Sequence, residues 1–252
     1  MEVDYDSLEM LKAALEGQDA VICALGIGTD ASVHKMLIDA AVAAKVKRFI
    51  PNEFGLDIMN PLVRQLPICE NKLKITTHLE ARALKSGMTY TYLINSVFLD
   101  WGLQHNFILD VSQSKPTIFG SGDETFGTTT MATAVKAVVR ILQNYNETIN
   151  RTVYIQEAVV SQNKLLAIAK RLRPGKVWEP VFVNLAEMKM EADSMVKKGA
   201  YDLSIWYSYL YIALFAAGYG GRMMQTDNAL FGIKEMTEEE IEEVVRVNLP
   251  NL

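Results

Sequence analysis

This sequence of 252 residues has few cysteines, few histidines and no net positive charge, and each of these features argues against a class of protein. The only two cysteines, Cys23 and Cys69, disfavour a secreted disulfide framework, so a reducing, cytoplasmic location is expected. The net charge of −5 argues against a partner nucleic acid held by phosphate neutralisation. The first residues are acidic and lack the apolar core of a signal peptide.

Metal-ligand spacing and long apolar runs are also missing. His34, His78 and His105 show no ligand spacing with another histidine, cysteine or carboxylate, so no metal site is expected. We interpret His34 and His78 as ordinary helix residues. Residues 203–218 are uncharged over about 16 positions, which is shorter than the ~20 that a membrane-spanning helix needs. We therefore expect a buried or cleft-lining helix there and no membrane contact.

Apolar strands alternate with helical patterns in the first half of the chain. Residues 19–25 (DAVICAL) form a near-continuous apolar run, which is typical of a strand covered on both faces. Residues 47–51 and 89–94 predict two further strands, with helices over residues 33–44 and 69–86 between them. This alternation predicts an α/β fold with a Rossmann-like, doubly wound parallel sheet.

The pattern loosens after Asn95. Residues 115–129 fit strand, turn and strand, and residues 151–157 alternate like a strand. Further helices are predicted over residues 131–142, 161–172, 185–198 and from residue 237 onward. We therefore divide the chain into an NAD(P)-binding Rossmann-like part (residues 1–110) and a smaller α+β substrate lobe (residues 111–252), with interleaved elements at an approximate boundary.

The glycine-rich fingerprint of dinucleotide-binding folds, G-x-G-x-x-G between a strand and a helix, does not occur in the sequence. Gly26-x-Gly28 follows a strand but lacks the third glycine, so an ordinary tight turn competes with a cofactor role. Residues 218–221 (GYGG) follow a helix, which is the wrong context for the fingerprint.

Lys72 is the lysine most suited to chemistry. On a helix over residues 69–86 it shares a face with an apolar stripe, whereas Lys74 and Lys85 lie on the opposite side. A lysine ammonium that is partly removed from water loses hydration and becomes a usable acid or base near neutral pH. The alternative is a lysine in the first helical turn whose ammonium extends into solvent.

Polar and aromatic residues follow two of the predicted strands at their carboxyl ends, where α/β folds bind ligands. The first group is Asn52, Glu53 and Phe54; Phe54 fits either a ring of a ligand or a buried turn. The second group is residues 95–101, in which Phe98 and Trp101 fit either a flat aromatic pocket or the core. These two groups predict a ligand site at one edge of the sheet.

Several of these segments resemble one family. Residues 47–55 (KRFIPNEFG) are similar to the motif K-R-F-x-P-S-E-F-G of the atypical short-chain dehydrogenases of the NmrA-like and isoflavone-reductase-like group. Residues 72–80 and 89–92 resemble two further segments of this family, and residues 98–103 (FLDWGL) resemble the fungal version of a third. The resemblance extends over essentially the whole chain and is weaker in the second half.

The resemblance implies a Rossmann domain with a small substrate lobe, NADPH as cofactor, and a small, often aromatic metabolite as substrate. Lys72 matches the family's catalytic lysine, a general acid/base. The residues expected to bind the cofactor are Leu25, Gly26, Asn52, Glu53, Phe54, Asn95 and Phe98. Val97 and Trp101 are expected in the substrate pocket. The resemblance leaves a homodimer open, and also a non-catalytic alternative: a dinucleotide-binding redox sensor or regulator of the NmrA type.

The chain departs from the family in two places. Family members begin with a strand, a glycine-rich loop, a helix and a second strand, whereas residues 1–5 of this chain align with their third strand. We therefore expect an N-terminally truncated, fungal-type member that lacks the first βαβ unit. In addition, Thr76 stands where the plant enzymes carry an arginine four residues after the lysine.

Overall fold

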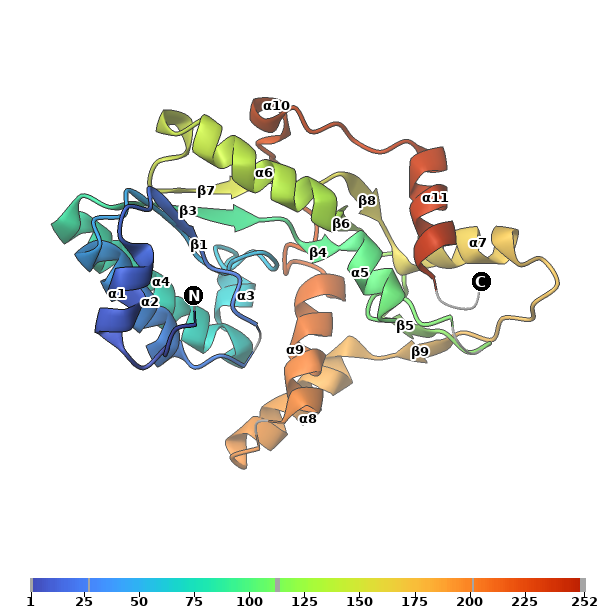
Figure 1. Cartoon of the computed structure of the whole chain (residues 1–252). Coiled ribbons are helices and arrows are strands. Elements are labelled where there is room, and N and C mark those ends of the chain that lie inside the picture. Colours follow the sequence, from blue (N-terminus) through green and yellow to red (C-terminus); the bar gives the residue numbers. More distant parts are fainter. Residues whose placement is uncertain (1, 27, 112–113, 201, 250–252) are drawn as a thin grey trace.

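A parallel sheet forms the first layer of the protein in a computed structural model that describes residues 2–26, 28–111, 114–200 and 202–249. Its four strands lie in the order β1-β2-β3-β7, and every neighbouring pair is parallel (Figure 1). The strands are β1 (Ala20–Ile22), β2 (Arg48–Ile50), β3 (Thr89–Ile94) and β7 (Arg151–Tyr154). The parallel order confirms the α/β fold predicted from the sequence.

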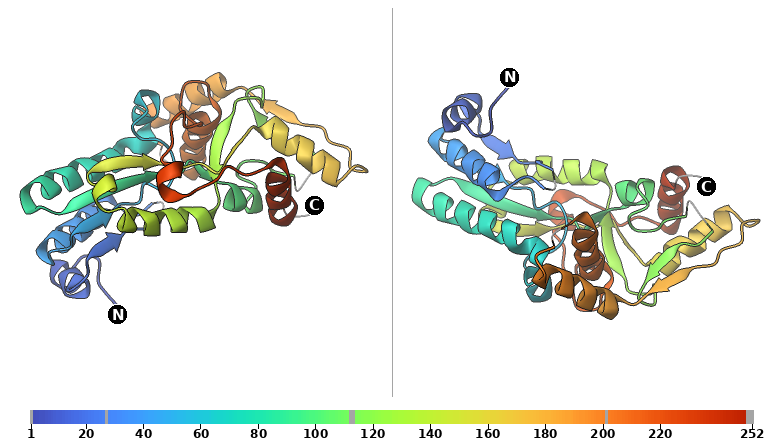
Figure 2. Two further views of the ribbon diagram at one scale, coloured as in Figure 1. Left: turned by 90° about the horizontal axis from the view of Figure 1, so that it is seen from above. Right: turned by 90° about the horizontal axis from the view of Figure 1, so that it is seen from below.

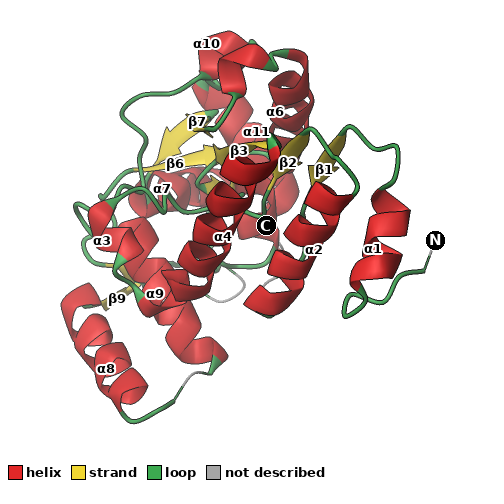
Figure 3. Cartoon of the chain, turned by 90° about the vertical axis from the view of Figure 1, so that its left-hand side faces the viewer, coloured by secondary structure: helices red, strands yellow, loops and turns green. Residues whose placement is uncertain are grey.

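Helices cover both faces of this sheet (Figures 1 and 3). Phe49 and Tyr92 pack on one face, and their neighbours Ile50 and Leu93 pack on the other, because successive side chains of a strand point to opposite sides. The first face is covered by α1 (Leu8–Leu15), α2 (Ala31–Ala43) and α4 (Glu70–Ser86). The second face is covered by α6 (Met131–Gln143) and α10 (Asn228–Phe231). The sheet is therefore doubly wound, as expected.

A second lobe lies at the end of the molecule away from α1 and α2 (Figure 2). Its three-stranded sheet contains β4 (Val97–Phe98), β6 (Phe126–Thr129) and β8 (Ala158–Val160). A two-stranded sheet joins β5 (Thr117–Phe119) to β9 (Val181–Val183). Both strands predicted within residues 115–129 are present, but β5 and β6 pair with different strands and not with each other. Three helices complete this lobe: α5 (Leu99–Gln104), α7 (Gln162–Leu172) and α11 (Glu238–Asn248).

The two parts of the chain are interleaved. Strand β7 lies after residue 110 yet pairs with β3 in the main sheet, and α6 and α10 pack on that sheet too. A cut at residue 110 would therefore separate strands of one sheet. The division into residues 1–110 and 111–252 stays an approximate prediction.

The uncharged stretch of residues 203–218 contains α9 (Leu203–Phe215), which lies beside α8 (Leu185–Lys197) (Figure 3). One side of α9, including Ile205 and Tyr209, packs against the short helices α3 (Pro61–Arg64) and η1 (Pro67–Cys69). Its other side packs against the second lobe through Leu214 and Phe215. The expected buried helix is confirmed, and none of the helices in the described ranges is long and apolar enough to cross a membrane.

The strand expected at residues 1–5 is not present over residues 2–5, which lead into α1 without strand hydrogen bonds; Met1 lies outside the described residues. The helix boundaries agree better with prediction. The helix carrying Lys72, α4, spans Glu70–Ser86. Gly87 terminates it with a positive φ of 78°. Thr237 and Glu240 form a capping box at the start of α11.

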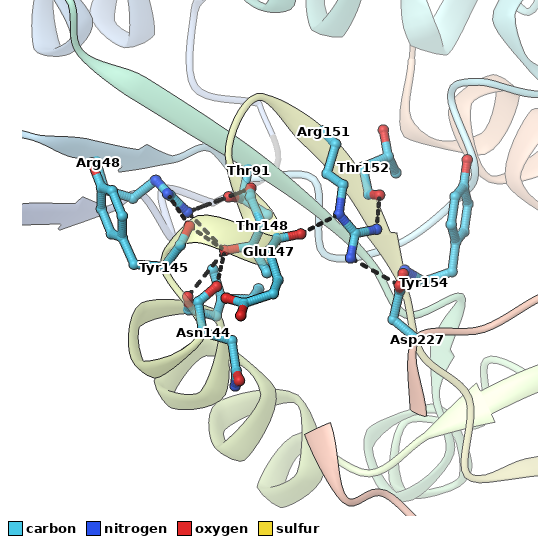
Figure 4. A network of polar contacts seen from close by, with 11 residues as sticks. Arg48, Thr91, Asn144, Tyr145, Glu147, Thr148, Arg151, Thr152, Tyr154 and Asp227 are labelled. Carbon is cyan, nitrogen blue, oxygen red and sulfur yellow. Dashed lines mark hydrogen bonds and ion pairs between the residues drawn. The ribbon is translucent and has the colours of Figure 1, made fainter. Parts of the chain in front are cut away.

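Arg48 is the first residue of β2 and lies at the amino-terminal edge of the sheet, where it holds neighbouring elements together (Figure 4). Its side chain is fully buried and forms no ion pair with a carboxylate of the described residues. Instead it donates to Thr89 Oγ1 (2.8 Å), Thr91 Oγ1 (2.7 Å) and the carbonyl of Tyr145 (2.9 Å), and it lies 4.1 Å from the centre of the Tyr145 ring. These contacts tie β2 and β3 to the turn η2 (Asn146–Thr148) that leads into β7.

Candidate functional site

The loops that follow β1, β2 and β3 meet at the carboxyl edge of the parallel sheet. The side-chain amide of Asn52, after β2, donates to the carbonyl of Leu25, after β1. Leu25 is half-buried, and Gly26 is exposed with open space around its α-carbon. Both lie where the sequence places a cofactor loop.

Lys72 extends from the first turn of α4 to the end of β2. Its Nζ donates to the carbonyl of Asn52 (2.6 Å) and to Glu53 Oε2 (2.8 Å). The side chain of Lys72 is 36% exposed. The apolar stripe beside it is confirmed, because Ile75, Leu79 and Ala83 are buried. The ammonium of Lys72 is therefore paired with Glu53 while its side chain stays partly exposed.

Glu53 supplies the negative charge of this pair, and its side chain is only 2% exposed. Burial raises the pKa of the Glu53 carboxyl, because removal from water disfavours its charged form, and the neighbouring Lys72 ammonium opposes that rise. The sequence predicted Glu53 as a cofactor contact; the structure shows it as the partner of Lys72.

Four other titratable side chains surround the pair, and sequence reasoning gave none of them a role at the site. Cys23 Sγ lies 3.5 Å from His34 Nδ1, and both side chains are buried. Burial lowers the pKa of His34 and raises that of Cys23, and it raises the pKa of Cys69 to about 11. Burial also raises the pKa of Tyr92. The sequence signal for His34 was its position in the first turn of the helix after β1, which directs it toward the carboxyl edge.

Asn95 ends β3 at the same edge and is fully buried. Its Oδ1 has no hydrogen-bond partner among the described residues, although buried polar atoms are nearly always paired. The next residue, Ser96, has a φ of 57°, which a residue other than glycine adopts only under local constraint. An orphaned acceptor beside a strained residue is an arrangement suited to a ligand.

The apolar residues predicted at the site are all partly buried: Phe54, Val97, Phe98 and Trp101. Phe54 packs against the core cluster beneath α6, next to Ile50 and Leu93, so the buried-turn interpretation fits its position. Val97 packs against the core of the second lobe. Phe98 is half-buried. Trp101 is half-buried and stacks on His105, with ring centres 4.4 Å apart.

Asp100 and Thr76 have structural contacts. The carboxylate of Asp100 accepts from the backbone N–H of Met131 (3.1 Å) at the start of α6 and from that of Trp101 (2.9 Å) in the first turn of its own helix. Thr76 is buried and donates to the carbonyl of Leu73 (3.1 Å). No charge therefore stands one turn after Lys72.

Two cavities lie elsewhere in the molecule. One of about 720 Å³ lies between α6, α11 and the loop after α10, and one of about 450 Å³ lies between the turn after β5, α8 and α9. Neither is lined by a residue predicted for the site. No cluster of histidine, cysteine and carboxylate side chains suitable for a metal ion occurs in the described part of the chain.

The residues present fit one end of a dinucleotide. A buried, unpaired acceptor at Asn95 and the ammonium of Lys72 suit the polar nicotinamide end. The loop after β1 suits a pyrophosphate less well, because the carboxylate of Asp30 already accepts from the N–H of Ser32 at the start of α2. The described residues therefore offer contacts for the nicotinamide end of the cofactor, and they include no glycine-rich loop that would hold its pyrophosphate.

Parallel strands covered on both faces, with polar groups collected at their carboxyl edge, are the arrangement of Rossmann-type oxidoreductases. Residues 1–191 match the family model described as the NmrA-like family, so the chain belongs to that family.

Known relatives agree with this membership. The chain is 31% identical over 243 residues to oxidoreductase aprR of Aspergillus flavus, covering 96% of this chain and 80% of that protein. An isoflavone reductase crystal structure has a TM-score of 0.73 and 25% identity, covering 98% of this chain and 80% of that one. The structure of AtPrR2 with NADP+ and (+)pinoresinol has a TM-score of 0.71 at 19% identity, covers 98% of this chain and 81% of that one, and shows the shared fold alone.

Proposed function

We propose that this protein is an NADPH-dependent reductase of a small, planar or aromatic metabolite, with Lys72 as the general acid/base. The observation that carries the proposal is the position of Lys72, whose Nζ lies 2.6 Å from the carbonyl of Asn52 at the carboxyl end of β2. This is the edge at which α/β folds bind ligands. Similarity to a fungal oxidoreductase and to an isoflavone reductase supports the same reaction class.

NADPH supplies a hydride when it is bound. Asn95, with its unpaired Oδ1, and the backbone at Asn52 are the groups of this chain that would hold the nicotinamide end. Leu25 and Gly26 would line the cofactor on the side of β1. These roles stay predictions, as do those of Glu53, Phe54 and Phe98.

Lys72 would complete the reduction by moving a proton. As hydride arrives at one atom of the substrate double bond, negative charge develops on the other atom, and the ammonium of Lys72 donates a proton to it. Lys72 is left as a neutral amine and regains a proton from water, which reaches it because the side chain is partly exposed. One hydride and one proton are thus added to the substrate.

The substrate would lie against Val97 and Trp101, at the border between the main sheet and the second lobe. Similarity to isoflavone reductases, whose name denotes an aromatic substrate, supports an aromatic substrate here. A cytoplasmic location is part of the proposal, and the two free, buried cysteines Cys23 and Cys69 are compatible with it. A homodimer stays a prediction that analytical ultracentrifugation would test.

The proposal is tested by measuring NADPH binding by calorimetry and NADPH oxidation by absorbance, with (+)-pinoresinol and an isoflavone as probe substrates. Binding together with substrate-dependent oxidation supports a reductase. Binding without oxidation across a wide panel of aromatic compounds would instead indicate the alternative, a dinucleotide-binding sensor or regulator. Absence of NADPH binding would contradict both functions.

A further inference from the structure

The environment of Lys72 contains a single strong counter-charge. Among the described residues, Glu53 is the only carboxylate within ion-pair distance of its ammonium. Cys23, Cys69 and Tyr92 are kept protonated and His34 is kept neutral by burial, so these neighbours carry no charge near neutral pH. The electrostatic state of Lys72 therefore depends mainly on Glu53.

We infer that Glu53 is a positioning residue for Lys72: its buried carboxylate holds the ammonium beside the carbonyl of Asn52. This inference rests on the proposed reductase function. Glu53 acts through Lys72, whose ammonium lies 2.8 Å from its Oε2.

The physical reason is the burial of one partner only. When Lys72 gives its proton to the substrate, the Glu53 carboxylate is left inside the protein without a compensating charge, and such a state is strongly unfavourable. The neutral amine therefore takes a proton back from solvent, through its own exposed side. Glu53 thus favours restoration of the ammonium after each turnover.

The same helix provides a matched control. Lys74 Nζ lies 2.7 Å from Glu70 Oε1, but the side chains of these two residues are 49% and 69% exposed. Water screens such a surface pair, which contributes little. Glu53→Gln and Glu70→Gln therefore remove the same kind of charge from a buried pair and from an exposed pair on α4.

Competitive labelling of amines with acetic anhydride at pH 8, followed by peptide mass spectrometry, tests the inference without any substrate. Lys72 must leave its ion pair before its amine reacts, so we expect Glu53→Gln to accelerate labelling of Lys72 about tenfold. Glu70→Gln should change labelling of Lys74 less than about twofold. Glu53→Asp, which keeps a carboxylate, should leave labelling of Lys72 closer to that of the wild type than Glu53→Gln does.

Unchanged labelling of Lys72 in a folded Glu53→Gln protein, as judged by thermal melting, would overturn the inference. The wild type supplies a second measurement that does not depend on the variant folding. Relative to urea-unfolded protein, Lys72, whose partner Glu53 is buried, should be labelled more slowly than Lys74, whose partner Glu70 is exposed, and equal protection of the two amines would also overturn it.

Turnover distinguishes this inference from the proposed function. With (+)-pinoresinol or an isoflavone as probe, Glu53→Gln should lower kcat about tenfold, and Glu53→Asp, which keeps the carboxylate, should retain more of the wild-type kcat. If the wild type oxidises no NADPH, the proposed function fails while the labelling result still decides the electrostatic role of Glu53. If the wild type is active and Glu53→Gln keeps its kcat, positioning by Glu53 is contradicted.

Discussion

The carboxylate of Glu53 and the ammonium of Lys72 lie 2.8 Å apart, yet the first side chain is 2% exposed and the second 36%. One half of the ion pair belongs to the interior and the other reaches solvent. A proton can therefore leave and return through Lys72 while the opposing charge stays fixed beneath it. This asymmetry is the basis of the chemistry that we propose for the site.

Replacement of Lys72 by alanine should abolish turnover and preserve cofactor binding. Loss of a positioned general acid lowers rates by about 100-fold or more, whereas Nζ contacts Asn52 and Glu53 on the protein side. Steady-state NADPH oxidation and calorimetry measure the two effects. Lys74→Ala, which removes an exposed lysine from the same helix, is the control, and turnover retained by Lys72→Ala would contradict the assignment.

Replacement of Asn95 by alanine should weaken NADPH binding about tenfold, because its buried Oδ1, which has no partner among the described residues, is the acceptor proposed for the nicotinamide end. Calorimetry measures the affinity and thermal melting the stability. Asn106 carries another buried, unpaired Oδ1, and its φ of 55° suits glycine, so Asn106→Gly is a matched control. Equal effects of the two variants on NADPH affinity would argue against a cofactor contact at Asn95.

Replacement of Arg48 by methionine should lower the free energy of unfolding by about 3 kcal/mol, since hydroxyl and carbonyl groups at the turn into β7 would lose their donor. Arg48 is fully buried and donates to Thr91, Thr148 and the carbonyl of Tyr145 (Figure 4). Urea unfolding measures the change. The exposed Arg140, which contacts only Gln143 in the described structure, should tolerate the same replacement within about 0.5 kcal/mol.

The two cysteines should resist alkylation in the folded protein. Burial raises the pKa of Cys69 to about 11, so about 0.1% of this thiol is ionised at pH 8, and the thiolate is the reactive form. The pKa of Cys23 is raised as well. Intact mass after iodoacetamide should show no adduct at pH 8, slow labelling as the pH rises toward that pKa, and two adducts after denaturation. Rapid labelling of the native protein at pH 8 would contradict the burial of these thiols.

Local patterns predicted much of the fold. The near-continuous apolar run at residues 19–25 indicated a strand covered on both faces, and the β-forming residues at 89–94 indicated a further strand. Helical periodicity placed Lys72 on the inward face of α4. These features are readable because each depends on neighbours within a few positions of the chain. The strand expected at residues 1–5 was wrong over its described part, since a single apolar residue, Val3, gave little periodicity.

The sequence by itself determined the alternation of strands and helices, the inward position of Lys72 and, through residues 47–55, the family. Only the tertiary structure decided that β7 completes the main sheet and that Phe54 packs against the core. It also decided that Glu53 pairs with Lys72 and that Cys23 lies beside His34. The reason is physical. Periodicity reports which side of an element is buried, but the partner of a buried charge comes from another element and is fixed only when the elements pack together.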